Sequence, residues 1–197
     1  MKVLKILNLK KVFSKIILFC KLKKFKKAGK NISFSYGFDF KGENRIELYN
    51  NIYGGKNFRL YAWEKYGKQT FNPEVIIKSG ASIGNDVFIS CINKIYIGKN
   101  CLMGDNILIS DNSHGSNDII EKNIPHKDRM LTSKGGIVIG DNVWICRNVC
   151  ILSNVTIGNN VIIGANSVVT HSFGDNLVIA GSPAKVIKHL EENKLLI

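Results

Sequence analysis

The sequence predicts an all-β solenoid, in which short parallel strands wind into stacked coils, and three observations support this. Aliphatic side chains recur every six residues without a slip, a period that neither an α-helix nor an ordinary strand reproduces. Asparagines recur at the same spacing, and asparagine is the non-glycine residue that most readily adopts a left-handed backbone. Glycines and small side chains lie between them. The aliphatic positions are Ile139, Ile145, Ile151, Ile157, Ile163 and Val169, and the asparagines are Asn142, Asn148, Asn154, Asn160 and Asn166.

Each six-residue repeat therefore predicts one strand, one corner and one inward-pointing aliphatic side chain. The same register appears upstream from Ile77 and resumes, after two extra residues, at Ile97. Three repeats make a coil of eighteen residues, and stacked coils bury a continuous core along a line instead of around a compact centre.

At the N-terminus, residues 1–30 are expected to form a basic amphipathic segment, a helix followed by a lysine-rich tail. They hold eleven of the 28 basic residues of the chain and none of its 15 acidic residues. Read as a helix, the segment has one apolar stripe, made of Ile6, Leu9, Phe13, Ile16, Ile17 and Cys20. Such a helix suits an anionic membrane surface, and a plain cap on the open end of the solenoid is the alternative. A nucleic-acid partner is not expected, since no recognition motif accompanies the charge.

Neither a cleavable signal sequence nor a membrane-spanning helix is expected in this segment. Lys15 interrupts the apolar stretch, and the longest clean apolar run, residues 16–20, is too short to cross a bilayer. The five cysteines show no metal or redox spacing, so we interpret them as reduced thiols. The expected location is the cytoplasm, either free or peripheral on the inner face of the cytoplasmic membrane.

The β-helix itself is expected to fill residues 31–181. Looser repeats with large inward side chains begin it, from Phe34 to Phe58, and residues 64–75 are interpreted as an irregular connection. Residues 115–136 interrupt the repeat and are expected to protrude as a loop.

Residues 182–197 are expected to form a short C-terminal helix. Ser182 and Pro183 are the basis for this, because serine is a common N-cap and proline is favoured in the first helical turn. The chain is thus predicted to be one solenoid domain with a helix at each end.

Several stretches resemble a known family. The repeats, together with SDNSHG at 110–115, LTSKGG at 131–136, IGDNVWI at 139–145 and AGSPAKVI at 180–187, are similar to the hexapeptide-repeat acyltransferases. Within that family they resemble the sugar O-acetyltransferases of bacterial capsule, colanic acid and lipopolysaccharide synthesis, over roughly residues 76–188. The resemblance implies a left-handed parallel β-helix, against the usual right-handed crossover preference. It also implies acetyl-CoA as co-substrate, a sugar or polysaccharide-precursor acceptor, and a homotrimer with active sites between subunits.

His114 is the candidate general base. It stands at the start of the protruding loop, and imidazole is suited to taking up a proton near neutral pH. The resemblance implies the same role, since the catalytic histidine of the family lies sixteen residues after the glycine matched here by Gly98. Many relatives read Asp-His-x-His where this chain has Asp111-Asn112-Ser113-His114, and we interpret Asn112 as one more asparagine corner.

Three residues are candidates for contact with the acceptor: Asn93, Asp111 and His126. For Asp111, accepting hydrogen bonds within a turn is the favoured alternative, and for His126 a solvated loop position. No serine or cysteine with a paired base is apparent, so the sequence favours direct acyl transfer over a covalent acyl-enzyme.

The resemblance further implies a groove for coenzyme A, parallel to the solenoid axis. The candidate residues are Trp144, Arg147, Ala165, Thr170, Lys185 and Lys188. Arg147 should lie one coil beneath Ala165, because eighteen residues separate them. Lys185 and Lys188 match family positions that carry basic residues near the cofactor phosphates, and an ordinary lysine-bearing terminal helix is the alternative.

Other classes of function remain open. An N-acetyltransferase acting on an amino sugar or another small amine would use the same base. Periodicity alone does not exclude a noncatalytic interaction scaffold, since solenoids often serve as binding surfaces, but His114, the protruding loop and Trp144 together argue against it. A metalloenzyme of the γ-carbonic-anhydrase type would need three histidine ligands, and apart from His114 the coils offer only His171, so no metal is expected.

Overall fold

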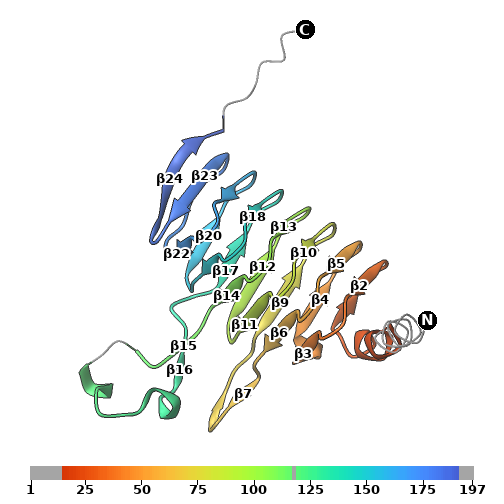
Figure 1. Ribbon diagram of the computed structural model, residues 1–197. Helices are drawn as coiled ribbons and strands as arrows, with labels where there is room; N and C mark the ends of the chain where they lie inside the picture. The colour runs from red at the N-terminus through yellow and green to blue at the C-terminus, as the bar shows by residue number, and fades with distance from the viewer. Residues whose placement is uncertain (1–14, 117–118, 191–197) are drawn as a thin grey trace, which may run out of the picture.

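The computed structural model describes residues 15–116 and 119–190, and it is a three-sided prism of stacked coils (Figure 1). Three sheets of parallel strands form its sides, and each complete coil contributes one strand to each sheet. The predicted parallel β-helix is confirmed. It begins at Lys27 instead of residue 31, because the first strand already pairs with the second coil.

The strands of the three sides are as follows. Sheet A holds β1 (Lys27–Ala28), β4 (Ile46–Leu48), β9 (Glu74–Ile77), β12 (Lys94–Ile97), β17 (Ile137–Ile139) and β20 (Val155–Ile157). Sheet B holds β2 (Ile32–Phe34), β5 (Ile52–Gly54), β10 (Ser82–Ile83), β13 (Leu102–Met103), β18 (Trp144–Ile145), β21 (Ile162–Ile163), β23 (Leu177–Gly181) and β24 (Ala184–His189). Sheet C holds β3 (Asp39–Lys41), β6 (Arg59–Ala62), β11 (Phe88–Cys91), β14 (Leu108–Ser110), β19 (Cys150–Ile151) and β22 (Val168–Val169).

The core is the predicted ladder of aliphatic side chains. Ile97, Ile139 and Ile157 lie opposite one another in successive strands of sheet A, and all three are buried. The N-terminal coils are filled by larger rings, as expected, and Phe34 stacks on Phe58 with ring centroids 5.2 Å apart. Burying such a side chain stabilises the fold by about 1.5–3 kcal/mol, so the ladder dominates the stability of the prism.

Asparagines form the corners, as predicted. Asn148 and Asn166 have φ angles of 59° and 60°, and the Asn148 amide donates to the Asn166 side-chain oxygen at 2.9 Å. The expectation for Asn112 is wrong, because Asn112 is not among the described residues with positive φ. Its amide nitrogen instead donates to the carbonyl and hydroxyl oxygens of Ser90, at 3.0 and 3.1 Å.

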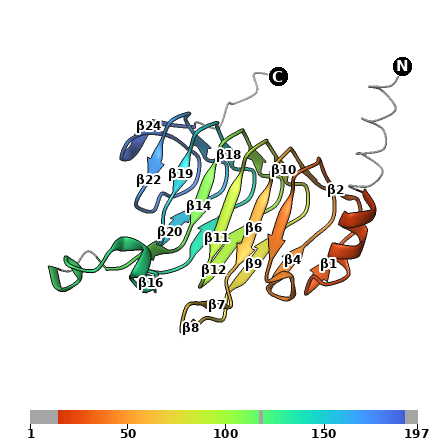
Figure 2. The same cartoon turned by 60° about the horizontal axis from the view of Figure 1, so that its bottom comes forward.

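Residues 15–22 are helical and cover the N-terminal end of the prism (Figures 1 and 2). Leu18 is buried, Leu22 packs against the core, and the Phe25 ring meets the Phe40 ring edge-on at 5.3 Å. The helix therefore caps the first coil. Ile6, Leu9 and Phe13 of the predicted stripe lie outside the described residues. Within the described part of the chain, no helix has the length and apolar character needed to span a membrane.

Two expectations are corrected. Residues 64–75 contain an antiparallel hairpin, β7 (Lys65–Tyr66) and β8 (Gln69–Thr70), that projects from the corner between sheets C and A. The expected C-terminal helix is absent from the described residues, because 184–189 form β24, antiparallel to β23. The last coil leaves β23 with an open edge, and a segment with β-branched Val186 and Ile187 pairs with that edge.

The protruding loop leaves the prism through a pair of short strands. β15 (Ser113–His114) and β16 (Leu131–Thr132) pair antiparallel at its base, and the short 3-10 helices η2 (Ile119–Glu121) and η3 (His126–Asp128) lie beyond them. Figure 2 shows this loop and the β7–β8 hairpin projecting from the same edge of the prism.

Candidate functional site

His114 lies at the corner where the chain leaves sheet C for sheet A, on the short strand β15. Its backbone pairs with Leu131 across the neck of the loop, and its side chain is exposed. Among residues 15–116 and 119–190, the imidazole has no hydrogen-bond partner. One ring nitrogen is therefore free to accept a proton from a bound group.

The β7–β8 hairpin holds this strand pair in place. The side-chain oxygen of Gln69 accepts from the Leu131 N–H at 2.7 Å, and its nitrogen donates to the Leu131 carbonyl at 2.9 Å. The Tyr66 ring meets the His114 ring edge-on, with centroids 5.5 Å apart. The sequence did not lead us to predict this hairpin or its contacts with Leu131 and His114. The available signal was Gly67 between two short polar segments, since glycine at the first central position is typical of two-residue hairpin turns.

Asp111 lies directly beneath this corner and is completely buried. Its carboxylate accepts from the backbone N–H groups of Ile92 and Asn93, at 2.8 and 2.9 Å, and from the Cys91 thiol at 3.2 Å. Asp111 therefore has no surface to offer an acceptor, and its assignment to the acceptor is replaced by the turn role. The carboxylate fixes the adjacent corner of sheet C, from which the His114 strand departs.

Four of the five cysteines are poorly suited to act as nucleophiles, because burial keeps their thiols protonated. Burial, and then the Asp111 carboxylate, raise the pKa of the Cys91 thiol well above its usual range. Burial raises the pKa of Cys101 to about 11, and it also raises the pKa values of Cys146 and Cys150. These four thiols stay protonated near neutral pH, which favours direct transfer.

A row of aromatic rings leads along the outside of the prism to His114. Tyr61 meets Trp63 edge-on at 5.3 Å, Trp63 meets Tyr66 at 6.3 Å, and Tyr66 meets His114. The Trp63 indole N–H donates to the Ser90 hydroxyl at 3.2 Å, which fixes the ring. Partly exposed rings with polar edges suit a ligand that presents both apolar and hydroxyl groups.

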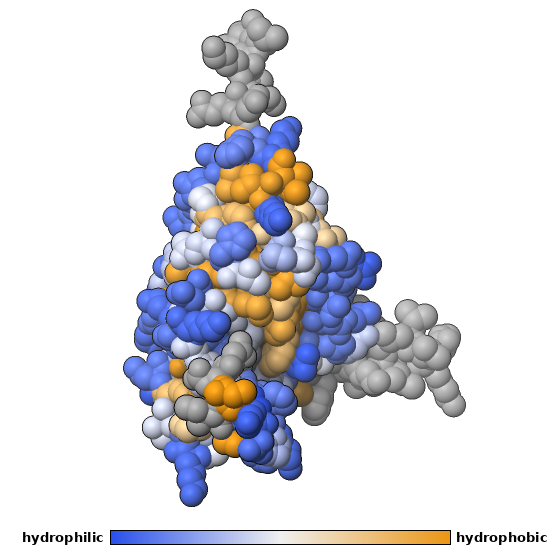
Figure 3. All heavy atoms as spheres, turned by 90° about the vertical axis from the view of Figure 1, so that its left-hand side faces the viewer, coloured by the Kyte–Doolittle hydropathy of each residue, from blue (hydrophilic) through white to orange (hydrophobic). Residues whose placement is uncertain are grey.

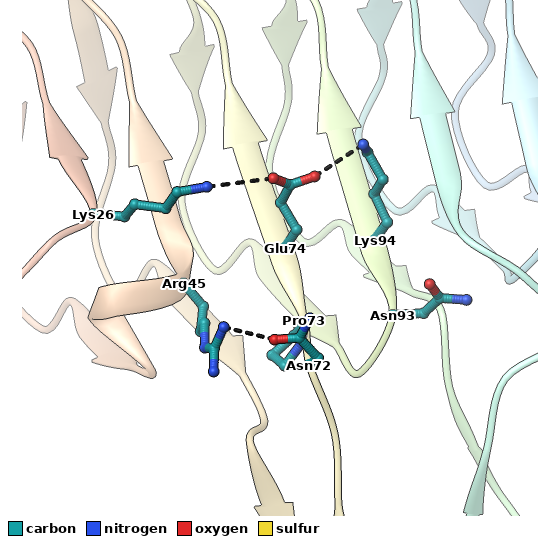
Figure 4. Close-up of a pocket in the computed structure, with 7 residues that line it drawn as sticks. All are labelled: Lys26, Arg45, Asn72, Pro73, Glu74, Asn93 and Lys94. Carbon is teal, nitrogen blue, oxygen red and sulfur yellow. Dashed lines mark hydrogen bonds and ion pairs between the residues drawn. The ribbon is translucent and has the colours of Figure 1, made fainter.

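A cleft of about 340 Å³ opens on the sheet A side of the same edge (Figure 4). It is lined by Lys26, Arg45, Asn72, Pro73, Glu74, Asn93 and Lys94. Glu74 accepts from Lys94 at 2.8 Å and from Lys26 at 3.4 Å, and the hydrogen bond from Lys94 is the main reason that the pKa of Glu74 is lowered. Lys26 also pairs with Glu47 at 2.9 Å, and Arg45 pairs with Glu64 at 2.6 Å, so each cation of the lining has an acidic partner. The cleft therefore suits an uncharged polyhydroxyl group better than a phosphate.

The remaining acceptor candidates lie near this edge. Asn93 is exposed at the end of the cleft, and its backbone is tied to the buried Asp111 carboxylate. His126 is exposed at the start of η3, which folds back against β15. In the part of the chain that is described, no three histidine, cysteine, aspartate or glutamate side chains come together as a metal site.

The candidate cofactor residues other than Thr170 lie away from the edge that carries His114. Trp144 is 46% exposed on the outer face of sheet B. Arg147 and Ala165 lie on the corner between sheets B and C in successive coils, and the Asn166 N–H donates to the Arg147 carbonyl at 3.1 Å, so the predicted stacking is confirmed. Thr170 follows β22 at the corner between sheets C and A, and Lys185 and Lys188 are exposed on β24.

A single chain therefore does not bring the candidate base and all the candidate cofactor residues together. His114 and the Arg147–Ala165 pair occupy different edges of the prism, with the width of sheet C between them. A site that uses both must combine an edge of one prism with an edge of another.

The bacterial transferase hexapeptide family (six repeats) matches residues 136–171. The chain is 35% identical over 160 residues to WbbJ of Escherichia coli K12, named as a candidate lipopolysaccharide biosynthesis O-acetyl transferase, covering 79% of this chain and 78% of that protein.

Solved structures share the fold. One is AntD, an N-acyltransferase from Bacillus cereus in complex with dTDP-4-amino-4,6-dideoxyglucose and coenzyme A, with a TM-score of 0.71, 22% identity, and coverage of 87% of this chain and 88% of that one. Another is a hexapeptide-repeat acetyltransferase from Vibrio cholerae complexed with acetyl coenzyme A, with a TM-score of 0.55, 22% identity, and coverage of 87% and 75%.

Proposed function

This chain belongs to the bacterial hexapeptide-repeat acyltransferases, whose fold is the left-handed parallel β-helix, and from that premise we propose that it transfers an acetyl group from acetyl-CoA to a sugar hydroxyl. The observation that carries the proposal is the exposed His114 imidazole, held on a braced strand at one edge of the prism. The similarity to WbbJ favours an acceptor used in bacterial surface polysaccharide synthesis.

Transfer to an amine is the second candidate. AntD shares the fold and is an N-acyltransferase bound to an amino sugar nucleotide. The same imidazole would serve either acceptor, since both must lose a proton during acyl transfer.

In the proposed mechanism, His114 accepts the proton of the acceptor hydroxyl as its oxygen attacks the thioester carbonyl. The new C–O ester bond forms, the C–S bond breaks, and the imidazolium returns its proton to the departing thiolate. Because the thioester is already activated, the protein needs only to position the hydroxyl and handle this proton. The hairpin contacts through Gln69 and Tyr66 keep the imidazole in place for both transfers.

Exposed cations on sheet B and on its corner with sheet C suit the phosphates of coenzyme A. Arg147, Lys185 and Lys188 form no ion pair with any described residue, so their charges are available. Trp144, Ile162, Val178 and Lys188 follow one another in one row across sheet B, so the Lys188 charge and the Trp144 ring belong to the same side of the prism, three strands apart.

A transfer assay tests the proposal. Purified protein is incubated with radiolabelled acetyl-CoA and a panel of nucleotide-linked, lipid-linked and polymeric sugars. An O-acetyl product loses its label in mild alkali, whereas an N-acetyl product keeps it. Alkali-stable label would favour the amine acceptor, and no transfer to any sugar would favour a noncatalytic scaffold.

We predict a homotrimer whose active sites lie between subunits. This prediction rests on two observations. His114 lies on a different edge of the prism from Arg147 and Ala165, and apolar side chains form partly exposed rows on the outer faces of the sheets. On sheet C, Leu108, Cys150 and Val168 lie in register and half-buried, and Figure 3 shows apolar surface on the side where β22 and the loop lie. Such surface typically marks an interface.

Sedimentation at micromolar concentration should show three chains. Complementation should show that the sites are shared. The His114→Ala and Ala165→Trp chains are each expected to be inactive alone, but random co-assembly should restore about a quarter of the wild-type sites. An active monomer, or no recovery in mixed trimers, would contradict the shared site.

Lys185→Glu combined with Lys188→Glu is expected to raise the KM for acetyl-CoA about 5–30-fold with little change in kcat, because phosphate contacts act on binding. The difference in affinity between variant and wild type should be smaller for dephospho-CoA, which lacks one of the phosphates. The matched control, Lys56→Glu with Lys99→Glu, changes the net charge equally at two other exposed lysines. Equal KM values for both double variants would leave Lys185 and Lys188 as ordinary surface residues.

A further inference from the structure

The cap helix carries a second apolar face that the prism does not use. Leu18 and Leu22 point toward the first coil, whereas Ile16 and Phe19 are 56% and 62% exposed. Ile16, Phe19 and Cys20 are spaced i, i+3 and i+4, so they share one side of the helix, away from Leu18. We call these three residues the outer face. The stripe predicted from the sequence is therefore separate from the residues that cap the prism.

Lysines surround the outer face, and several of them have no counter-charge. Lys15, Lys23 and Lys24 are exposed, and the Lys23 ammonium lies 4.6 Å from the centre of the Phe19 ring. Lys21 and Lys26 pair with acidic side chains of the prism, but Lys15, Lys23 and Lys24 form no ion pair with a described residue. Residues 1–14 add four lysines and no acid to the sequence.

We propose that the outer face and its lysines dock the protein on an anionic lipid surface. The apolar side chains would enter the interface while the lysine heads meet lipid phosphates, as in other interfacial amphipathic helices. The helix lies at the end of the prism, whereas His114 lies at a side edge, three coils away from the first (Figure 1). Docking through the end therefore leaves the candidate active site accessible.

Charge complementarity decides the occupant. An apolar protein partner would have to bury the lysines unpaired, at a high cost in desolvation. A soluble polyanion would use the lysines but leave Ile16 and Phe19 in water. An anionic bilayer satisfies both parts of the surface together, and the two contributions can be separated by mutation.

The full-length protein is tested by co-sedimentation with vesicles of phosphatidylcholine, with and without phosphatidylglycerol. Lys23→Glu with Lys24→Glu is expected to weaken binding to the anionic vesicles at least about tenfold, since each lysine at a surface contributes about fivefold. The matched control, Lys99→Glu with Lys122→Glu, has the same net charge and should bind nearly like wild type. Ile16→Ser with Phe19→Ser should also weaken binding. The binding that this variant retains through its lysines should be lost as the salt concentration rises.

Because all of these side chains are exposed, the variants should fold, which circular dichroism verifies. Equal binding by the serine variant and wild type would mean that only charge acts, and it would overturn the docking face. Equal weakening of vesicle binding by the two glutamate double variants would also overturn the docking face, because the position of the lysines on the protein would then not matter. Wild-type binding that does not depend on phosphatidylglycerol would exclude the anionic surface.

Discussion

His114→Ala is expected to lower kcat by about 10²- to 10⁴-fold, while the affinity for acetyl-CoA stays within a few fold. The imidazole acts on a proton that moves during the reaction, so its loss removes transition-state stabilisation and little ground-state binding. Because the side chain is exposed and hydrogen-bonds to no described residue, its removal should leave the fold intact. Steady-state kinetics with a competent acceptor and calorimetry of coenzyme A binding measure the two quantities.

His126→Ala is the matched control for His114. It removes an exposed imidazole from the same loop, and we expect it to change kcat far less. If both variants keep near-normal turnover, His114 is not the base. If both lose turnover equally, the loop as a whole is required and neither residue is singled out.

Asp111→Ala is expected to destabilise the protein by about 2–5 kcal/mol, because the buried Ile92 N–H and the partly buried Asn93 N–H lose their acceptor. The wild-type carboxylate is completely buried, so water cannot replace it without opening the corner. Chemical denaturation at one fixed protein concentration measures the change, since an oligomer has concentration-dependent stability.

Asp141→Ala is the control for this effect. Its carboxylate also accepts from a backbone N–H, that of Lys99 at 2.7 Å, but this bond is exposed. Water can satisfy the freed N–H, so the expected cost is below about 1 kcal/mol. Similar losses for both variants would show that burial of Asp111 is not what matters.

The repeating part of the fold was predictable from the sequence because each coil meets the same local requirements. An inward aliphatic side chain such as Ile145 and a corner residue with positive φ such as Asn148 recur at a fixed spacing, and that spacing is visible in one dimension. His114 was singled out as the candidate base by its motif, and that role remains a prediction. The left-handed sense came from family resemblance, since periodicity does not distinguish the two hands.

The exceptions to the repeat were decided by contacts between distant parts of the chain. Gln69 and Leu131 are 62 residues apart in sequence, yet they hydrogen-bond twice and position the candidate base. Their pairing depends on how two insertions leave the same edge of the prism, which no local pattern records.

The two ends of the chain show the same division. The sequence alone predicted a basic helix with one apolar side, and residues 15–22 are helical, but Leu18 and Ile16 are both apolar, and only packing on the first coil decided which is buried. The C-terminal segment has an N-cap signal, but the open edge of β23 offered backbone hydrogen bonds to an extended chain. Local propensity is worth tenths of a kcal/mol per residue, so a partner strand outweighs it. The sequence determined the repeat and its corners, and the tertiary structure decided which surfaces the repeat leaves free.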